Sequence, residues 1–155
     1  MTSDISPAAE ATQPPRAVLA GHGDFAAGMA SAVAQISGRG DVFVTLTNRG
    51  RSAEDIEQML RDALDVVSVR VVFTDLPAGS CTFAARRLQR ERPDLVLVTG
   101  ANLATLLDFV FAVEGDESDP AAAAATAAAH AAEKGRAALT VVPSRTAAGG
   151  ARGAA

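Results

Sequence analysis

Residues 69–80, with the sequence VRVVFTDLPAGS, combine an apolar β-branched run with an abrupt change to polar and turn-forming residues. An apolar run bounded in this way is typical of a strand followed by a loop. Residues 95–99, LVLVT, repeat the pattern and are followed by a glycine. Unbroken apolar strands are typical of a parallel sheet whose two faces are both covered by helices. These two stretches therefore predict an α/β fold.

The segments on either side extend the same alternation of strand and helix. Residues 17–20 and 42–47 have the apolar character of two further strands. Apolar residues at helical spacing, together with caps such as Ser52, predict helices between and after the strands. The predicted helices cover residues 25–36, 53–64, 80–90, 103–113 and 120–134. Four strand-then-helix units predict a small doubly wound sheet of four parallel strands, with helices on both faces.

The two ends of the chain differ from this pattern. Residues 137–142, AALTVV, form a candidate fifth strand before Pro143. Residues 1–16 are rich in Pro, Ser and Ala, and residues 144–155 are small and rich in glycine, so both are predicted to be disordered tails. The sequence therefore predicts one domain over residues 17–143, a length that a single core supports.

Composition excludes several classes of function. The net charge is −4 and only 4% of the residues are aromatic, so neither a nucleic-acid partner nor a basic membrane surface is expected. One cysteine cannot form an internal disulfide, and one cysteine with two histidines cannot build a structural zinc site. The sequence contains no secretory signal and no long apolar span. We therefore expect a cytoplasmic protein without a metal or a cofactor.

Chemistry in a doubly wound sheet is expected at the carboxyl ends of the strands. Three loops fall there, at residues 21–24, 75–80 and 100–102. The first contains His22 between two glycines, which allow a tight turn that leaves the imidazole accessible. If the strands before the first two loops are neighbours, Asp75 lies beside His22, fixes its tautomer and frees Nε2 as a nucleophile. The alternative roles are a helix-capping histidine and a turn-forming aspartate.

The start of the predicted helix at Ser80 offers a place for an anion. Free backbone N–H groups and the helix dipole favour negative charge there, and the helix that begins near residue 25 offers a second such end. Two helix ends facing a histidine and a carboxylate suit a phosphoryl group on the ring. The Ser80 hydroxyl is interpreted either as a further donor to that group or as an N-cap, and Asp24 is interpreted as an N-cap.

Cys81 gives a rival interpretation, a cysteine hydrolase that uses Cys81, His22 and Asp75. A thiol in the first turn of a helix can have a lowered pKa, but a lone cysteine is more often a small buried filler. His130, within an alanine-rich segment, is interpreted as a surface or packing residue. The sequence contains no G-x-S-x-G elbow, no P-loop and no G-x-G-x-x-G motif, so neither nucleotide binding nor serine esterase activity is indicated.

Three segments in register carry a resemblance to a known family. Residues 20–29 (AGHGDFAAGM), 73–80 (FTDLPAGS) and 98–103 (VTGANL) resemble the mannose-type enzyme IIA domains of the bacterial phosphoenolpyruvate-dependent sugar phosphotransferase system. The sequence looks closest to the branch that serves N-acetylgalactosamine and related amino sugars, and the resemblance covers roughly residues 17–139. It implies a phosphoryl carrier that uses neither a metal nor a nucleotide.

The resemblance also implies roles for individual residues and partners. His22 would accept a phosphoryl group from phosphohistidine of the small carrier protein HPr and pass it to a IIB component, with Asp75 in support. The protein would thus serve a membrane IIC/IID complex indirectly, and it would be a homodimer that exchanges its C-terminal strand between subunits. The residues expected to bind the phosphoryl group are Gly23, Gly79 and Ser80.

One loop departs from the family pattern. The sequence Ala78-Gly79-Ser80-Cys81 stands where the family usually has Gly-Gly, then Ser or Thr, then Pro. An alanine at a position that needs a positive φ would reshape the loop, and the missing proline removes a rigid helix start. Two alternative functions stay open: the related carrier that feeds dihydroxyacetone kinase, and a regulatory or binding module that performs no transfer.

Overall fold

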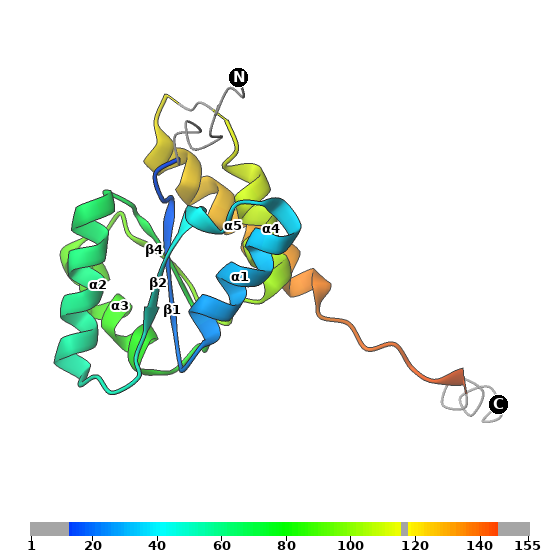
Figure 1. The fold of residues 1–155 in the computed structure, drawn as a ribbon, viewed down its shortest axis with the longest axis horizontal. Coiled ribbons are helices and arrows are strands. Elements are labelled where there is room, and N and C mark those ends of the chain that lie inside the picture. The colour runs from blue at the N-terminus through cyan, green and yellow to red at the C-terminus, as the bar shows by residue number, and fades with distance from the viewer. Residues whose placement is uncertain (1–12, 116–117, 146–155) are drawn as a thin grey trace, which may run out of the picture.

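A four-stranded parallel sheet forms the centre of the computed structural model, which describes residues 13–115 and 118–145 (Figure 1). The strands are β1 (Ala17–Gly21), β2 (Phe43–Thr47), β3 (Val71–Thr74) and β4 (Val96–Val98), in the spatial order β2-β1-β3-β4. All neighbouring strands run parallel, and Val18 of β1 pairs with Val44 on one side and Val72 on the other. The predicted doubly wound sheet is confirmed.

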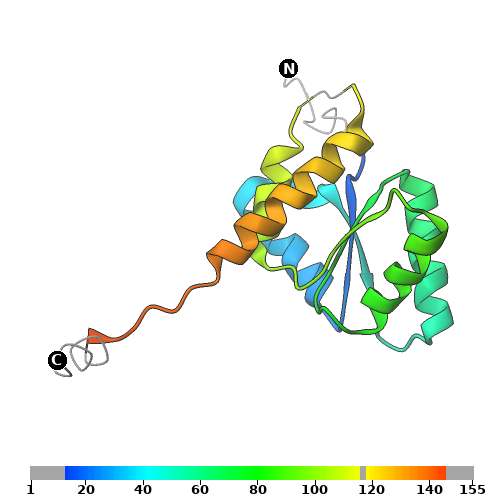
Figure 2. The same cartoon turned by 180° about the vertical axis from the view of Figure 1, so that it is seen from behind.

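Helices cover both faces of this sheet, as predicted (Figures 1 and 2). One face carries α1 (Phe25–Ser37), α4 (Leu103–Ala112) and α5 (Pro120–Ala138). The other face carries α2 (Ala53–Val67) and α3 (Ser80–Glu91), and a short 3-10 helix, η2 (Gly40–Val42), precedes β2. Helix α2 begins at a capping box formed by Ser52 and Asp55, so the predicted Ser52 cap is confirmed.

Successive residues of the central strands enter two separate cores because side chains alternate across a sheet. Leu19 of β1 and Phe73 of β3 are buried against α1, α4 and α5, while Val72 is buried against α2 and α3. The ring of Phe73 makes edge-to-face contacts with Phe43 and Phe109, at centroid distances of 6.0 and 5.0 Å. Burial on both faces explains why the central strands are unbroken apolar runs.

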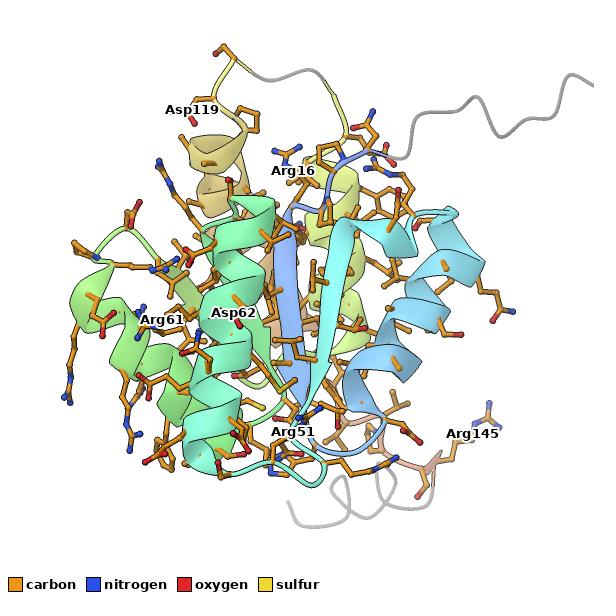
Figure 3. The ribbon with its side chains drawn as sticks, turned by 60° about the vertical axis from the view of Figure 1, so that its left-hand side comes forward. Arg16, Arg51, Arg61, Asp62, Asp119 and Arg145 are labelled. Atoms are coloured by element: carbon orange, nitrogen blue, oxygen red, sulfur yellow. The ribbon has the colours of Figure 1, made fainter. Side chains whose placement is uncertain are left out.

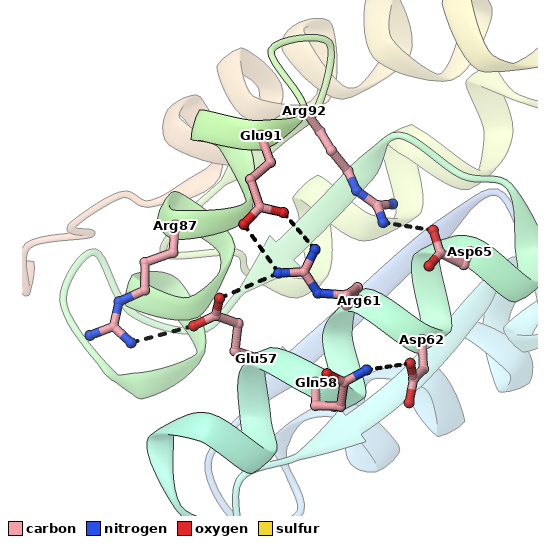
Figure 4. Close-up of polar contacts among 8 residues, drawn as sticks. All are labelled: Glu57, Gln58, Arg61, Asp62, Asp65, Arg87, Glu91 and Arg92. Carbon is pink, nitrogen blue, oxygen red and sulfur yellow. Dashed lines mark hydrogen bonds and ion pairs between the residues drawn. The ribbon is translucent and has the colours of Figure 1, made fainter.

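The layer formed by α2 and α3 carries a row of ion pairs on its outer surface (Figure 4). The pairs that join the two helices are Arg61 with Glu91, Arg87 with Glu57, and Arg92 with Asp65. Exposed ion pairs stabilise a fold little, by about 0–1 kcal/mol each. The packing of α3 against α2 therefore rests mainly on the core beneath them, which includes Leu60 and Leu88.

The strand order places a switch point between β1 and β3. The chain leaves β1 toward β2 on one side and later adds β3 and β4 on the other side, so the connections after β1 and β3 diverge. We call the edge of the sheet where the four strands end the carboxyl edge. Figure 3 shows Arg51 at this edge and Arg16 at the opposite end of the molecule. The crevice expected for a ligand lies at the carboxyl edge, between the segments that follow β1 and β3.

Helix α5 is longer than predicted, and the candidate fifth strand is not formed within the described residues of this chain. Helix α5 continues through Gly135 to Ala138. A Cβ at position 135 would lie 1.7 Å from Oγ1 of Thr105 on α4. The glycine within α5 therefore permits close packing of the two helices. Residues 139–142 pair with no strand; they run away from the body, and Leu139 is almost fully exposed (Figures 1 and 2).

Arg16, which the sequence assigns to the N-terminal tail, belongs to the folded body. Its side chain is buried, and its guanidinium donates to the carbonyls of Val113 and Pro120 at 3.0 and 2.9 Å. Its backbone N–H donates to the carbonyl of Val42. Most of both predicted tails, residues 1–12 and 146–155, lies outside the described residues.

Candidate active site

The His22 imidazole and the Asp75 carboxylate meet at the carboxyl edge, where β1 and β3 end side by side. Nδ1 of His22 lies 2.8 Å from Oδ2 of Asp75, and the backbone N–H of His22 donates to the same oxygen at 2.8 Å. The side chain of Asp75 is 11% exposed and that of His22 is 49% exposed. Because a carboxylate accepts hydrogen bonds and cannot donate, Nδ1 carries the proton and Nε2 is left as a nucleophile. The structure thus brings these two predicted residues together.

Glycine on each side of His22 makes this arrangement sterically feasible. A Cβ on Gly21 would lie 2.9 Å from Oδ2 of Asp75 and 2.6 Å from the ring of Phe25. Gly23 has a φ of +53°, in the left-handed region that favours glycine. The chain therefore turns directly after His22 into α1 and leaves room for the carboxylate behind the ring.

The surroundings of Asp75 favour its charged form. Partial burial opposes ionisation, but hydrogen bonds from the backbone and the ring of His22, and the positive charge that the ring can carry, outweigh it. Together they hold the pKa of Asp75 below its usual value. Asp75 is therefore a carboxylate at neutral pH, able to orient the imidazole and to stabilise positive charge on it.

The amino end of α3 faces the ring of His22. Gly79 is the N-cap, and a Cβ on it would lie 3.2 Å from Cε1 and 3.9 Å from Nε2 of His22. A larger residue at this position would crowd the nucleophilic nitrogen. The first N–H groups of α3 have no carbonyl partner within the helix, so they and the helix dipole favour an anion next to the ring.

Ser80 is the first residue of α3, so its interpretation as the N-cap is wrong; Gly79 occupies that position. Its Oγ accepts a hydrogen bond from Nδ2 of Asn48 at 2.9 Å. Because this bond uses one lone pair of Oγ, the Ser80 O–H stays able to donate to an anion. Ala78, the departure from the family pattern, does not have a positive φ, so the alanine does not strain the loop.

The loop after β2 joins the site, although none of its residues was among the predicted site residues. The backbone N–H of Asn48 donates to the carbonyl of Gly21 at 3.1 Å, and its side chain reaches Ser80, so this loop ties the segments after β1 and β3 together. A signal was present in the sequence. Asn48, Arg49 and Arg51 directly follow a predicted strand, and residues at strand ends belong to the carboxyl edge.

Asp24 is the N-cap residue of α1, as interpreted, although its side chain does not cap the helix. Asp24 occupies the N-cap position, but its carboxylate makes no capping hydrogen bond and lies 3.2 Å from the guanidinium of Arg49. Its backbone has φ −94° and ψ 14°, whereas a capping side chain normally needs an extended N-cap residue to reach the N–H groups of the first turn.

Cys81 lies in the core between α2, α3 and the sheet. Burial and the charge of Asp75 raise the pKa of its thiol, and a hydrogen bond with Ser80 does not offset them. A cysteine nucleophile reacts as the thiolate, which this environment disfavours. The structure therefore favours the interpretation of Cys81 as a buried filler over the hydrolase.

Two other polar residues make contacts between α4 and α5. Asn102, in the third predicted loop, caps α4 and donates to the carbonyl of Gly135 on α5 at 2.9 Å. His130 lies on the exposed surface of α5, as interpreted, and its Nδ1 is 3.0 Å from Oδ2 of Asp108 on α4. Asn102 therefore joins α4 to α5, and His130 belongs to the surface of these helices.

Across residues 13–115 and 118–145, no group of three or more His, Cys, Asp or Glu side chains is placed to hold a metal ion. No helix in the same residues is both long and apolar enough to span a bilayer. The carboxyl edge therefore offers Nε2 of His22 as a nucleophile beside a helix end that favours an anion.

Comparison with known proteins identifies the family. The EIIA-man family model, described as the PTS system fructose IIA component, matches residues 16–127 of the chain. The chain belongs to this family. It is a IIA component of a phosphotransferase system (PTS), and the predicted relationship to mannose-type IIA domains is confirmed.

Solved structures share the fold of this IIA domain at low sequence identity. The PTS component EIIA from Streptococcus agalactiae is 22% identical, with a TM-score of 0.61 over 83% of this chain and 95% of that one. The mannose/sorbose-specific IIA subunit from Enterococcus faecalis is 21% identical, with a TM-score of 0.67 over 85% and 97%. The PTS IIA protein associated with the fucose utilization operon from Streptococcus pneumoniae is 20% identical, with a TM-score of 0.68 over 84% and 95%. No curated protein sequence matches the chain.

Proposed function

We propose that this IIA domain is a cytoplasmic phosphohistidine carrier. In this proposal Nε2 of His22 accepts a phosphoryl group from phospho-HPr and passes it to a IIB component during sugar uptake. The observation that carries the proposal is the contact between His22 and Asp75, which fixes the protonated Nδ1 and leaves Nε2 next to the amino end of α3. Membership of a family of PTS IIA components supports the same role.

The transfer exchanges one phosphorus–nitrogen bond for another. The lone pair on Nε2 of His22 attacks phosphorus while the P–N bond of the donor phosphohistidine breaks. The electron pair of that bond returns to the donor nitrogen, so the donor ring, which is protonated on its other nitrogen, becomes neutral. His22 keeps its proton on Nδ1, so the ring becomes cationic as the new bond forms. Asp75 stabilises this charge. Transfer to the IIB component runs through the same changes in the opposite direction.

The phosphoryl oxygens need donors throughout this exchange. We assign their binding to Gly23, Gly79 and Ser80. Gly79 keeps the space beside the ring open, Gly23 permits the turn directly after His22, and Ser80 contributes its O–H at the start of α3. Because the nucleophile and the leaving group are both imidazole nitrogens, catalysis consists of positioning and stabilisation of charge. No metal or nucleotide takes part in this scheme.

We also propose that two copies of the chain form a homodimer by exchanging the segment at residues 139–142. Leu139, Val141 and Val142 are exposed apolar residues, and β4 is an edge strand whose free backbone groups can pair with a strand from a second copy. A chain that ends at Ala138 should sediment as a monomer in analytical ultracentrifugation and keep its helical circular dichroism. A truncated chain that still forms dimers would contradict the exchange.

Phosphoryl transfer can be tested by incubating the protein with phosphoenolpyruvate, enzyme I and HPr, and measuring the intact mass. The expected result is one acid-labile phosphoryl group that is absent from His22→Ala and that a IIB component removes. Phosphorylation that no IIB component discharges would favour the regulatory module, and discharge only by dihydroxyacetone kinase would favour that alternative carrier. A folded protein that takes no phosphoryl group from competent phospho-HPr would contradict the proposal.

A further inference from the structure

Arg49 places a positive charge next to the proposed phosphoryl site. The start of its loop is fixed by two hydrogen bonds of Asn48, one to the carbonyl of Gly21 and one to the hydroxyl of Ser80. From this fixed point the guanidinium extends over Gly23, where a Cβ would lie 3.3 Å from Nη2 of Arg49. The side chain of Arg49 is 64% exposed, so it can change its conformation without disturbing the core.

Arg49 is paired with Asp24. Nη2 of Arg49 lies 3.2 Å from Oδ1 of Asp24, whose side chain is 84% exposed. An ion pair this exposed is weak, so the guanidinium can leave it for a more highly charged anion. Asp24 does not use its carboxylate to cap α1, which leaves Arg49 as its ionic partner among the described contacts.

A phosphoryl group on His22 creates a charge imbalance that Arg49 can correct. Such a group brings about 1.5 to 2 negative charges at neutral pH to a ring whose Nδ1 already contacts the Asp75 carboxylate. The donors assigned to it so far, Ser80 and the N–H groups of α3, are neutral. A guanidinium binds phosphate oxygens through two parallel N–H donors and keeps its positive charge.

We propose that Arg49 binds the phosphoryl group on His22. While that group is absent, the guanidinium pairs with Asp24. The inference rests on the proposed phosphorylation of His22 and adds a charged residue to that site. Movement of Arg49 from Asp24 to the phosphoryl group also uncovers the Asp24 carboxylate at the start of α1. The two states of the protein therefore present different charges to a partner.

The test uses chemical phosphorylation, which needs no partner protein. Phosphoramidate transfers its phosphoryl group to an imidazole nitrogen as its own P–N bond breaks and ammonia leaves. The protein carries His130→Gln, so that His22 is its one histidine. Titration by ³¹P NMR then gives the pKa of the bound phosphoryl group, which a neighbouring cation lowers because it favours the dianion. A role for Arg49 in loop structure alone would not move this pKa.

The two partners are expected to change this pKa in opposite directions. Arg49→Gln should raise the pKa of the phosphoryl group by about 0.5. Asp24→Asn should lower it, and this effect should be smaller when Arg49 is also replaced, because most of it depends on the released guanidinium. Arg51→Gln is the matched control: it removes the same charge from the same loop, and Arg51 has no ion pair with Asp24 in the described part of the chain. Its effect should be much smaller.

Equal effects of Arg49→Gln and Arg51→Gln would overturn the proposal, because the loop would then act only through its total charge. Additive effects of Asp24→Asn and Arg49→Gln on this pKa would show that Asp24 does not compete with the phosphoryl group for Arg49. If phosphoramidate fails to modify His22 in the folded protein, both the site and the role of Arg49 are wrong. If instead phospho-HPr fails to phosphorylate His22 while the titrations give the expected order, the carrier function is wrong and Arg49 still binds the phosphoryl group.

Discussion

The molecule contains two histidine–aspartate pairs of nearly the same local geometry. Nδ1 of His22 lies 2.8 Å from Oδ2 of Asp75, and Nδ1 of His130 lies 3.0 Å from Oδ2 of Asp108. Both imidazoles are exposed, and in both pairs the carboxylate contacts Nδ1 and not Nε2. The geometry of the pair therefore does not distinguish the proposed acceptor from a surface residue.

The surroundings do distinguish the two pairs. Asp75 accepts a second hydrogen bond from the His22 backbone, and the ring faces the start of α3 at Gly79. His130 lies midway along α5, where the backbone N–H groups already donate to carbonyls of the same helix. We infer that a phosphoryl site needs free donors for the anion in addition to a histidine–aspartate pair.

Replacement of the two carboxylates has the largest expected effect among the tests of this comparison. Asp75→Asn should lower the rate of phosphoryl transfer to His22 about 100-fold, because an amide neither holds the same tautomer nor stabilises a cationic ring. Asp108→Asn should leave the rate within about twofold of wild type. Rapid-quench kinetics with phospho-HPr measures both rates. Equal rates in the two variants would contradict the role of Asp75.

A methyl group at the start of α3 should have the next largest effect. Gly79→Ala places Cβ 3.2 Å from Cε1 of His22 and should slow transfer about tenfold by crowding the phosphoryl group. The fold should persist because φ at this position is 171°, an extended conformation open to any residue. Gly28→Ala in α1 is the control: its Cβ meets no atom within 4 Å, so transfer should be unchanged. An unchanged rate in Gly79→Ala would show that the space beside His22 is not needed.

Two neighbours in α3 separate donation from packing. Ser80→Ala should slow transfer about fivefold because it removes an O–H donor. Cys81→Ala should leave transfer unchanged and lower the free energy of unfolding by about 1 kcal/mol, because it removes a sulfur from the core. Kinetics and urea unfolding measure the two effects. Loss of transfer in Cys81→Ala would indicate that the thiol takes part in the reaction.

The effect of pH on stability should be the smallest of these. Because the pKa of Asp75 is lower in the folded state, its stabilising contribution is fully present above its ordinary pKa of 3.8 and is lost as the pH falls through the folded value. The difference in the free energy of unfolding between wild type and Asp75→Asn should therefore shrink as the pH falls below 3.8. A difference that stays constant into strong acid would mean that Asp75 gains no stability from its charge.

The sheet and the two central residues of the site could be predicted because their signals are local. Runs such as residues 69–74 and 95–99 identify buried strands without reference to the rest of the chain. Once the strands are placed, His22 and Asp75 follow directly after two of them, and the carboxyl edge brings them together.

Features that depend on contacts between distant segments could not be predicted in the same way. The continuation of α5 through Gly135 depends on its packing against Thr105 of α4, although a glycine near a helix end normally indicates a stop. The bond from Asn48 to Ser80 depends on how two loops meet. The pairing of Asp24 with Arg49 depends on backbone angles that the sequence does not specify.

The central claim is that the start of α3, and not a histidine–aspartate pair alone, creates the phosphoryl acceptor. The most direct test measures phosphoryl incorporation from phospho-HPr into wild type, His22→Gln and His130→Gln by intact mass under one set of conditions. We expect one phosphoryl group in wild type and in His130→Gln, and none in His22→Gln. Phosphorylation of His22→Gln that is lost when His130 is also replaced would contradict this claim, because the pair on α5 would then be an acceptor without a helix start beside it.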